Sequence, residues 1–262
     1  MLYGAIAGDI AGSTFEFYGM KGDEQELFPK GSEFTDDTIL TLAVADSLNS
    51  EVSMAEALRT YATLFPHPMG GYGSMFVTWL ESGEGAPAYN SFGNGSAMRV
   101  SAWAWAADTL EEVQRLARMS AECTHNHPEG IKGAIITAAC ANMVKYGNAT
   151  KQDIYNYTYK FYGDENKYKY PISMSLDDMR KIYRWDVTCQ GSVPAAIRCV
   201  LEADSYEEFM RNVMSLPCDM DTLGAIGGGI AEELFGLKDI DVKNILKQYL
   251  EPHLFDITYD TI

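Results

Sequence analysis

Helix-start signals recur along almost the whole chain, and they constrain its fold more than any other feature. Three segments pair a hydroxyl with a carboxylate three residues later, at Ser53–Glu56, Thr109–Glu112 and Ser205–Glu208. Such pairs satisfy amide groups that the first turn of a helix leaves without partners. Pro128 suits the first turn of a further helix, which we expect to end at Gly147 with a left-handed cap. Alternating β-branched runs with hairpin turns are nearly absent, so the sequence predicts an all-α fold.

Length and composition are consistent with one globular domain. The chain has 262 residues, 47% of them hydrophobic, which is enough to bury a sizeable core. We therefore expect a single domain over residues 1–262. Asp9 interrupts the apolar start of the chain, and no run approaches the roughly 18 apolar residues of a membrane span, so we expect a cytoplasmic protein. An odd number of cysteines without a C-x-x-C pair indicates reduced thiols.

The charge of the chain argues against some classes of partner. Acidic residues outnumber basic ones by 37 to 20, for a formal net charge of −17. A surface of this sign repels the phosphate backbone of nucleic acids and anionic membranes, so we expect neither a nucleic-acid polymer nor a membrane as a partner. A small phosphorylated ligand stays acceptable where metal ions and helix N-termini supply positive charge.

Two of the expected helices carry an unusual number of glycines. Gly4, Gly8 and Gly12 fall four apart, on one helical face. A second helix carries Gly224, Gly227, Gly228 and Gly229. Each glycine costs about 1 kcal/mol relative to alanine in a helix, and a close approach of two helices in the protein centre would offset that cost. The glycines alone do not separate a purely structural core from a functional centre, whereas the acidic residues beside them do.

Pairs of aspartates stand just before two strongly apolar helices. Asp36 and Asp37 precede the run 38–44, and Asp219 and Asp221 precede the run 223–226. Each pair taken singly is explained by helix capping, because threonine and aspartate are favoured caps and first-turn carboxylates complement the helix dipole.

Burial favours a metal site over simple caps. Both helices are apolar nearly all round, so their first turns are expected to point into the protein. Clustered buried carboxylates repel one another, and they must bind either protons or cations. Aspartates with Thr35 and Thr222 beside them offer only oxygen ligands, which suit Mg²⁺ or Mn²⁺ better than zinc. We therefore predict one divalent-metal site, which Asp9 and Glu16 could join, although Asp9 could equally well cap or orient a neighbouring helix.

Irregular stretches at 66–73 and 83–95 hold further candidates, since long loops in a compact domain tend to be functional or mobile. Gly93-Asn94-Gly95 precedes an apolar helix and could cradle a phosphate or ribose hydroxyl, although a turn with a cap is the simpler explanation. Gly71-Tyr72-Gly73 lets the backbone approach a ligand, or is only a loop. His125 could hydrogen-bond a sugar or phosphate, or be structural. Zinc is disfavoured because no further histidine or cysteine completes its ligands.

These residues fall in motifs that resemble the ADP-ribosylglycohydrolase family. The match runs from Gly4 to Gly236, almost the full chain, and six motifs occur in the family's order. They are Gly12–Phe17, Phe34–Thr38, Gly70–Gly73, Gly93–Arg99, Thr124–Gly130 and Gly191–Ala196. Any one of them alone would be a weak signal, but six in order make a specific one.

The resemblance implies a fold, a metal centre and roles for residues. The implied fold is an orthogonal multi-helix bundle with two Mg²⁺ or Mn²⁺ ions at the floor of a cleft. The family's metal ligands carry over onto Thr35, Asp36, Asp37, Asp219, Asp221 and Thr222. Catalytic roles carry over onto Glu16, as general base or proton shuttle, and onto Asp37, as the ligand that positions the attacking water. Contacts with ADP-ribose carry over onto Gly71, Tyr72, Gly73, Gly93, Asn94, Gly95 and His125.

The implied activity is hydrolysis of the N- or O-glycosidic bond between the distal ribose of ADP-ribose and a modified acceptor, through an oxocarbenium-like transition state. The acceptor is a protein side chain or a small conjugate, and we expect a monomer. Two alternatives stay open: a catalytically inactive ADP-ribose or nucleotide-binding protein of the same fold, and a structural helical protein whose acids only cap helices. One departure matters, because Cys218 and Met220 stand where the family has glycine and serine or threonine.

Overall fold

The structure of the chain, a computed structural model, describes residues 2–15, 26–48, 50 and 52–260. These residues form fifteen α-helices and no β-strand, which confirms the predicted all-α fold. The first eight helices are α1 (Tyr3–Ser13), α3 (Asp36–Ser47), α4 (Met54–Leu64), α5 (Ser74–Glu81), α6 (Gly95–Met98), α7 (Trp103–Ala106), α8 (Leu110–Glu122) and α9 (Pro128–Gly147). The other seven are α10 (Lys151–Tyr162), α11 (Leu176–Ile182), α12 (Cys189–Leu201), α13 (Tyr206–Met214), α14 (Met220–Phe235), α15 (Val242–Tyr249) and α16 (Pro252–Asp260).

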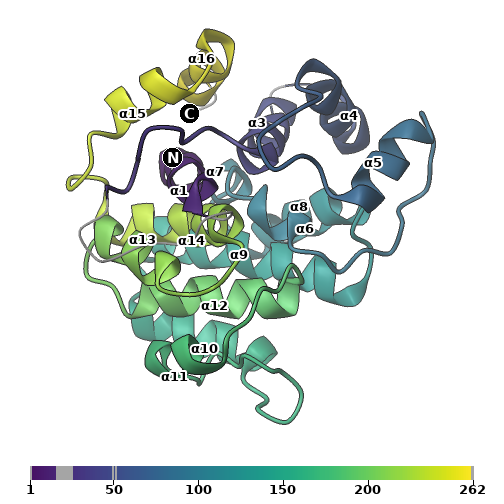
Figure 1. Cartoon of the computed structure of the whole chain (residues 1–262). Helices are drawn as coiled ribbons and strands as arrows, with labels where there is room; N and C mark the ends of the chain where they lie inside the picture. Colours follow the sequence, from purple (N-terminus) through teal and green to yellow (C-terminus); the bar gives the residue numbers. More distant parts are fainter. Residues whose placement is uncertain (1, 16–25, 49, 51, 261–262) are drawn as a thin grey trace.

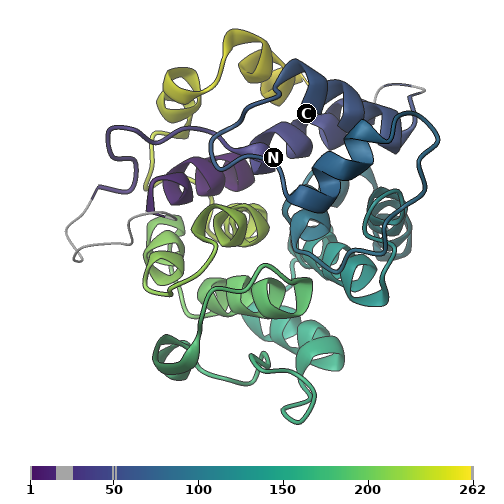
Figure 2. The same ribbon diagram turned by 45° about the vertical axis from the view of Figure 1, so that its right-hand side comes forward.

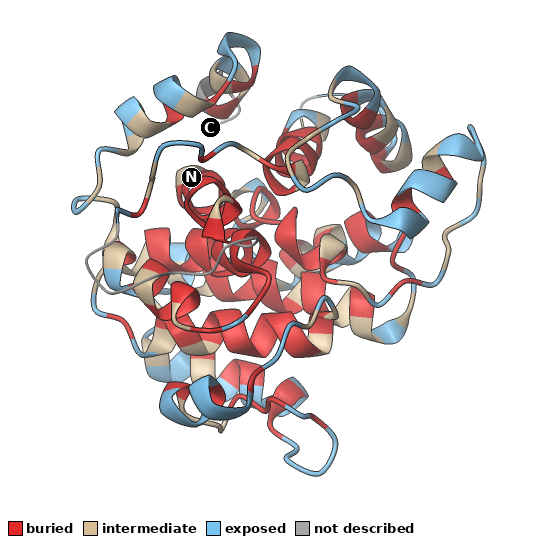
Figure 3. Cartoon of the chain, in the orientation of Figure 1, coloured by how far each residue is buried: buried red, intermediate tan, exposed pale blue. Residues whose placement is uncertain are grey.

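Two helices from opposite ends of the chain form the centre of the molecule. Helices α1 and α14 lie side by side, and α9, α12 and α13 pack against α14 (Figure 1). Around this centre, α3 packs against α4, α15 against α1 and α16 against α3 (Figure 2). Buried residues concentrate on α1, α9, α12 and α14, whereas the outer helices are exposed on one side (Figure 3). The core therefore surrounds the pair of helices in which the sequence places most of the helical glycines.

Glycine allows α1 and α14 to touch backbone to backbone. A Cβ atom added at Gly8 would lie 2.2 Å from the carbonyl oxygen of Gly224, which no side chain permits. At the end of α1, a Cβ atom added at Gly12 would lie 2.3 Å from the amide nitrogen of Asp221. The predicted close approach of the two helices is confirmed. It brings the end of α1 beside the start of α14, where two of the predicted metal ligands lie.

The three predicted helix starts at Ser53, Thr109 and Ser205 are confirmed. Each hydroxyl accepts a hydrogen bond from the backbone amide three residues later. The carboxylate partner does not always behave as expected, because Glu208 Oε2 accepts from the amide of Asp204 at 2.7 Å. The hydroxyl half of the pattern was therefore enough to locate these helices.

Helix α9 begins at Pro128, as predicted, but its left-handed cap is Asn148, whose φ is 51°. The expected glycine cap at Gly147 is wrong, because asparagine also adopts this conformation at modest cost. At 20 residues α9 is the longest described helix. None of the described helices combines the length and the apolar character that crossing a membrane requires.

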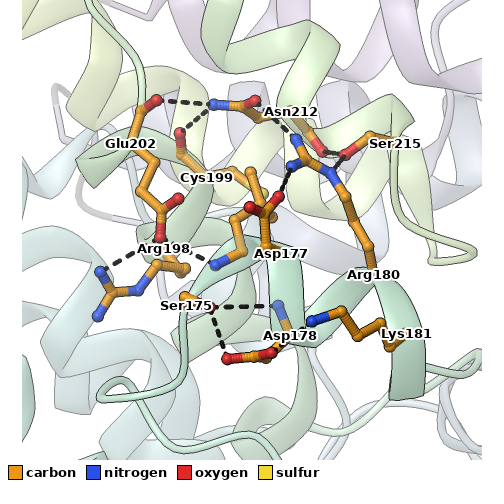
Figure 4. A network of polar contacts seen from close by, with 11 residues as sticks. Ser175, Asp177, Asp178, Arg180, Lys181, Arg198, Cys199, Glu202, Asn212 and Ser215 are labelled. Carbon is orange, nitrogen blue, oxygen red and sulfur yellow. Dashed lines mark hydrogen bonds and ion pairs between the residues drawn. The ribbon is translucent and has the colours of Figure 1, made fainter.

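Polar contacts add to the apolar packing of α11 (Figure 4). Arg180 Nε donates to Ser215 Oγ at 2.9 Å, and its Nη2 donates to Asn212 Oδ1 at 3.3 Å. The Asn212 amide in turn donates to the carbonyls of Cys199 and Glu202, each at 3.2 Å. This network joins α11, α12 and α13. None of its residues lines the cleft described below, so we regard it as structural.

Candidate active site

A cleft of about 360 Å³ opens at the N-terminal ends of α3 and α14. Its walls come from the starts of α5 and α6 and from both irregular stretches named from the sequence. The lining residues of these stretches are Gly70, Gly71, Gly73, Tyr89, Ser91, Gly93, Asn94 and Gly95. Arg99, His125, Trp185 and Val187 also line it. Elements from both ends and from the middle of the chain therefore meet at this one cleft.

Predicted metal ligands gather at the floor of the cleft. Asp36, Asp37, Asp219, Asp221 and Thr222 all line it, and all but Asp36 are buried. The Thr222 hydroxyl donates to Asp37 Oδ2 at 3.3 Å. Thr35 is buried behind the floor, and its hydroxyl also lies 3.3 Å from Asp37 Oδ2.

Burial raises the pKa of the floor carboxyls. The pKa of Asp37 lies well above its ordinary value because of burial and of the nearby charges of Asp9, Asp36 and Asp219. Burial also raises the pKa of Asp219, although its hydrogen bond from Asn94 opposes the shift. Ionised carboxylates at this floor therefore repel one another, and a cation would relieve the repulsion.

The donor set fits a divalent cation that prefers oxygen. Asp37 Oδ1 is buried and has no hydrogen-bond partner among the described residues, although such an atom ordinarily has one. Carboxylate oxygens of Asp9, Asp37 and Asp221 all lie within 4.8 Å of one another. Described residues offer neither sulfur nor nitrogen in this group, which suits Mg²⁺ or Mn²⁺.

Asp9 holds the start of α3 in place. Its carboxylate accepts hydrogen bonds from the amide and the hydroxyl of Thr35, at 3.0 and 2.7 Å, and from the amide of Thr38 at 3.0 Å. The Thr38 hydroxyl donates to it as well. Burial raises the pKa of Asp9 to about 6. These hydrogen bonds fit the orientation of a neighbouring helix, one of the two sequence-based interpretations. The position of Asp9 within 4.8 Å of the carboxylate oxygens of Asp37 and Asp221 fits the other, membership of the metal centre.

Asn94 faces the acidic floor. Its amide donates to Asp219 Oδ2 at 2.8 Å and to Ser192 Oγ at 3.0 Å. Gly93 and Gly95, on either side of it, line the cleft. The side chain thus orients a predicted metal ligand, a role that the sequence did not indicate.

The loop at 70–73 contributes backbone to the cleft. Gly71 and Gly73 line it, whereas Tyr72 does not. The Tyr72 hydroxyl donates to the carbonyl oxygen of Phe65 at 2.8 Å, and its ring contacts Phe76 with centroids 5.5 Å apart. In this structure Tyr72 therefore supports the loop rather than the ligand space.

His125 lines the cleft as a buried, neutral imidazole. Burial lowers its pKa well below the ordinary value, and the positive charge of Arg99 lowers it further. Its Nδ1 lies 2.8 Å from the hydroxyl of Thr124. Sequence reasoning assigned no role to Arg99 or Thr124, although both lie inside the motifs quoted above. It also missed three exposed apolar side chains on the cleft, Met75, Trp185 and Val187.

Three residues discussed from the sequence are not among the described residues that line the cleft. Glu16, the proposed general base, falls outside the described residues. Cys218 and Met220, which depart from the family pattern, both have side chains buried in the core. Neither side chain lines the cleft. Where the family has a serine or threonine hydroxyl, this chain therefore has the side chain of Met220, which packs in the core.

Comparisons with known proteins bear on the family and the fold of the chain. The family model described as ADP-ribosylglycohydrolase matches residues 1–252. ADP-ribosylhydrolase ARH3 of Homo sapiens is 26% identical over 309 aligned positions, covering 91% of this chain and 85% of the relative. ARH3 of Danio rerio is 25% identical, covering 91% and 82%. A solved structure, an ADP-ribosylglycohydrolase-related protein complex, aligns with a TM-score of 0.72 and 22% identity over 99% of this chain and 97% of that chain. At this identity that likeness bears on the fold alone, and it confirms the expected bundle.

Proposed function

This chain belongs to the ADP-ribosylglycohydrolase family, and we propose that it hydrolyses the N- or O-glycosidic bond between the distal ribose of ADP-ribose and an acceptor group. The acceptor is a modified protein side chain or a small conjugate. One water is consumed, and the products are ADP-ribose and the protonated acceptor. The names of the relatives, ADP-ribosylhydrolases, support the same class of reaction here.

The acidic floor of the cleft is the observation that carries this proposal. Four aspartates from two helix starts converge there, and one buried oxygen, Asp37 Oδ1, has no partner among the described residues. The residues that would hold two Mg²⁺ or Mn²⁺ ions are Thr35, Asp36, Asp37, Asp219, Asp221 and Thr222. When bound, such ions orient ribose hydroxyls and make an attacking water more acidic.

Other residues of the cleft bind the substrate and move the proton. Gly71, Gly73, Gly93 and Gly95 place no side chain between the backbone and the cleft, so phosphate and ribose oxygens can approach closely. Neutral His125 donates a hydrogen bond to one of these oxygens. The exposed apolar side chains on the cleft suit a nucleobase face. By the family resemblance, Glu16 removes a proton from the attacking water as positive charge builds at the anomeric carbon.

Release of ADP-ribose from a panel of conjugates tests the proposal. The panel holds arginine-, serine-, acetyl-ester- and nucleic-acid-linked ADP-ribose, each incubated with Mg²⁺ or Mn²⁺. We expect release from at least one conjugate, with a loss of 100-fold or more in Asp36→Ala, on the order of one lost metal contact in the transition state. Asp204→Asn, which alters a carboxylate whose side chain is 93% exposed, serves as the matched control and should retain activity.

The outcome also separates hydrolysis from binding alone. Tight ADP-ribose binding without turnover of any conjugate would show that the chain is a nucleotide-binding protein of the same fold. Melting that ignores both divalent metal and ADP-ribose would favour a purely structural role for the acidic residues, because a ligand of the folded state raises the melting temperature.

A further inference from the structure

Arg99 is a buried cation that lines the cleft. Its side chain is fully buried, and its Nη2 donates to the carbonyl of Ser120 at 2.9 Å and to Thr124 Oγ1 at 2.8 Å. Nε and Nη1 have no hydrogen-bond partner among the described residues. Burying a guanidinium group in this way is costly. The role of Arg99 is therefore sought in the hydrogen bonds that it makes.

The Thr124 hydroxyl connects Arg99 to His125 through two hydrogen bonds. A guanidinium group can only donate, so the Thr124 oxygen accepts from Arg99. The single hydrogen of the hydroxyl is then available to His125 Nδ1, which lies 2.8 Å away. The partly buried phenol of Tyr89 also faces Thr124. Burial raises the pKa of Tyr89 to about 12, so the phenol stays neutral and can donate to the second lone pair of the Thr124 oxygen.

A neutral imidazole carries one N–H group. If His125 Nδ1 accepts from Thr124, the hydrogen of the ring is on Nε2. That atom lies beside the glycine backbone of the cleft, 3.6 Å from a Cβ atom added at Gly93 and 3.2 Å from one added at Gly95. The hydrogen bond that the described structure gives the His125 side chain is at Nδ1, and the ring lines the cleft. Its N–H is consequently free to donate to a ligand oxygen in the cleft.

We propose that Arg99 and Thr124 are positioning residues that fix His125 as its Nε2–H tautomer, so that His125 donates a hydrogen bond to a phosphate or ribose oxygen of bound ADP-ribose. The identity of the ligand rests on the proposed function, whereas the tautomer does not. Replacing the hydroxyl of Thr124 removes the fixed donor of Nδ1. The ring then populates both tautomers, and only one of them can donate at Nε2.

Long-range ¹H–¹⁵N correlation spectra of the full-length, Mg²⁺-loaded protein read the tautomer directly. We expect Nε2–H for His125 in the wild type and in Thr124→Ser, and a mixture of tautomers in Thr124→Val, which keeps the shape but not the hydroxyl. His127 is the internal control, because its Nδ1 accepts from the amide of Glu129 at 3.1 Å and should not respond. His125→Asn assigns the signals.

Arg99→Met tests the first member of the chain of contacts. Without the guanidinium donor, a lone pair of the Thr124 oxygen becomes available to an Nδ1–H group, so the Nε2–H signal of His125 should decrease as in Thr124→Val. Should Arg99→Met not fold, Arg99→Lys, which keeps a cationic donor, must retain the Nε2–H tautomer. An Nδ1–H tautomer in the wild type, or an unchanged ring in folded Thr124→Val, would overturn the proposal.

Calorimetric titration with ADP-ribose supplies the second measurement. Loss of a fixed neutral hydrogen bond to the ligand predicts an affinity about tenfold weaker in Thr124→Val, restored to within about twofold in Thr124→Ser. Equal affinity in all three proteins would show that His125 does not bind the ligand and would overturn the proposal. If the wild type does not bind ADP-ribose at all, the proposed function fails, while the spectra still decide the tautomer.

Discussion

The hydroxyl of Thr222 donates to Asp37 Oδ2 across 3.3 Å, which joins the first turn of α14 to that of α3. The two residues are 185 positions apart, so this contact forms only when the ends of the chain come together. It satisfies one oxygen of Asp37 and leaves Oδ1 without a hydrogen-bond partner in the described structure. Folding therefore assembles the floor of the cleft from four aspartates and Thr222, a set of residues that includes no basic side chain.

Magnesium should raise the melting temperature of the wild type much more than that of Asp37→Asn. A ligand that binds only the folded state stabilises it by about 2.7 kcal/mol at one hundred times its dissociation constant. Asparagine keeps the size of aspartate but not its charge. Without metal, we expect the variant to melt no lower than the wild type, because repulsion with neighbouring carboxylates is relieved. With metal, we expect it to lose most of the increase in melting temperature. Differential scanning calorimetry over Mg²⁺ and Mn²⁺ titrations measures both quantities.

A full magnesium response in Asp37→Asn would mean that the acidic floor does not bind the ion. Asp204→Asn, which changes an exposed carboxylate that does not line the cleft, should respond like the wild type and controls for nonspecific effects of charge.

Gly8→Ala should destabilise the protein strongly. The added Cβ would lie 2.2 Å from the carbonyl oxygen of Gly224, in backbone that cannot move aside without separating α1 from α14. Overpacking of a rigid core typically costs about 1–3 kcal/mol, and a backbone contact belongs at the upper end. Urea unfolding measures the loss. Gly147→Ala is the matched control, because it is also helical and a Cβ there meets nothing within 4 Å. That variant should gain stability by about 0.5–1 kcal/mol, and equal losses in the two variants would refute the close-contact explanation.

Because of Glu232, the free energy of unfolding should decrease as the pH rises through the weakly acidic range. Burial raises its pKa from 4.5 to about 7, and its carboxylate accepts from the amide of Gly4 at 2.8 Å. Between these two values the folded protein holds a proton that the unfolded chain has released, so the free energy of unfolding decreases with increasing pH. The full effect is on the order of 3 kcal/mol.

Glu232→Gln mimics the protonated group and should flatten that part of the profile. Urea unfolding of both proteins at intervals from pH 4 to pH 8 provides the comparison. Identical slopes between about pH 4.5 and 7 would show that Glu232 does not titrate as its burial implies.

Local sequence patterns predicted the elements whose signals are local. A hydroxyl such as that of Ser53 satisfies an amide within the same turn, and glycines spaced by four mark one helical face whatever the partner helix is. Aspartates at two apolar helix starts also indicated the floor of the cleft, because burial of like charges has few physical solutions. These predictions depend on chemistry that acts within a few residues.

Side-chain direction was not predictable in the same way. Tyr72 was expected to face the ligand, yet its hydroxyl reaches the carbonyl of Phe65, an orientation that accompanies the packing of its ring against Phe76. Arg99 gave no local sign of acting on His125, because the described hydrogen bonds that connect the two residues run through the hydroxyl of Thr124. Such contacts depend on how loops and helices come together in three dimensions.

Asn94 is another residue whose side-chain direction the sequence did not predict, and its role can be tested by substitution. The sequence placed it among the residues that contact ADP-ribose, whereas its amide donates to Asp219 Oδ2, 125 positions away, at 2.8 Å. Groups that orient a metal ligand typically contribute about 10–100-fold to metal affinity or activity. We therefore expect Asn94→Ala to raise the Mg²⁺ concentration needed for half-maximal activity by about 10-fold or more, while saturating Mg²⁺ restores much of the rate.

Kinetics at varied Mg²⁺ and varied conjugate concentration distinguish the two roles of Asn94. A contact with ADP-ribose alone predicts a higher KM for the conjugate at every Mg²⁺ concentration, and that result would contradict the orienting role. Ser192→Ala is the matched control, since Ser192 Oγ accepts from the same amide at 3.0 Å without touching Asp219 through any described hydrogen bond. It removes the other partner of Asn94 and leaves the bond to Asp219 in place, so its Mg²⁺ requirement should remain within about threefold of the wild type, as expected for one neutral hydrogen bond.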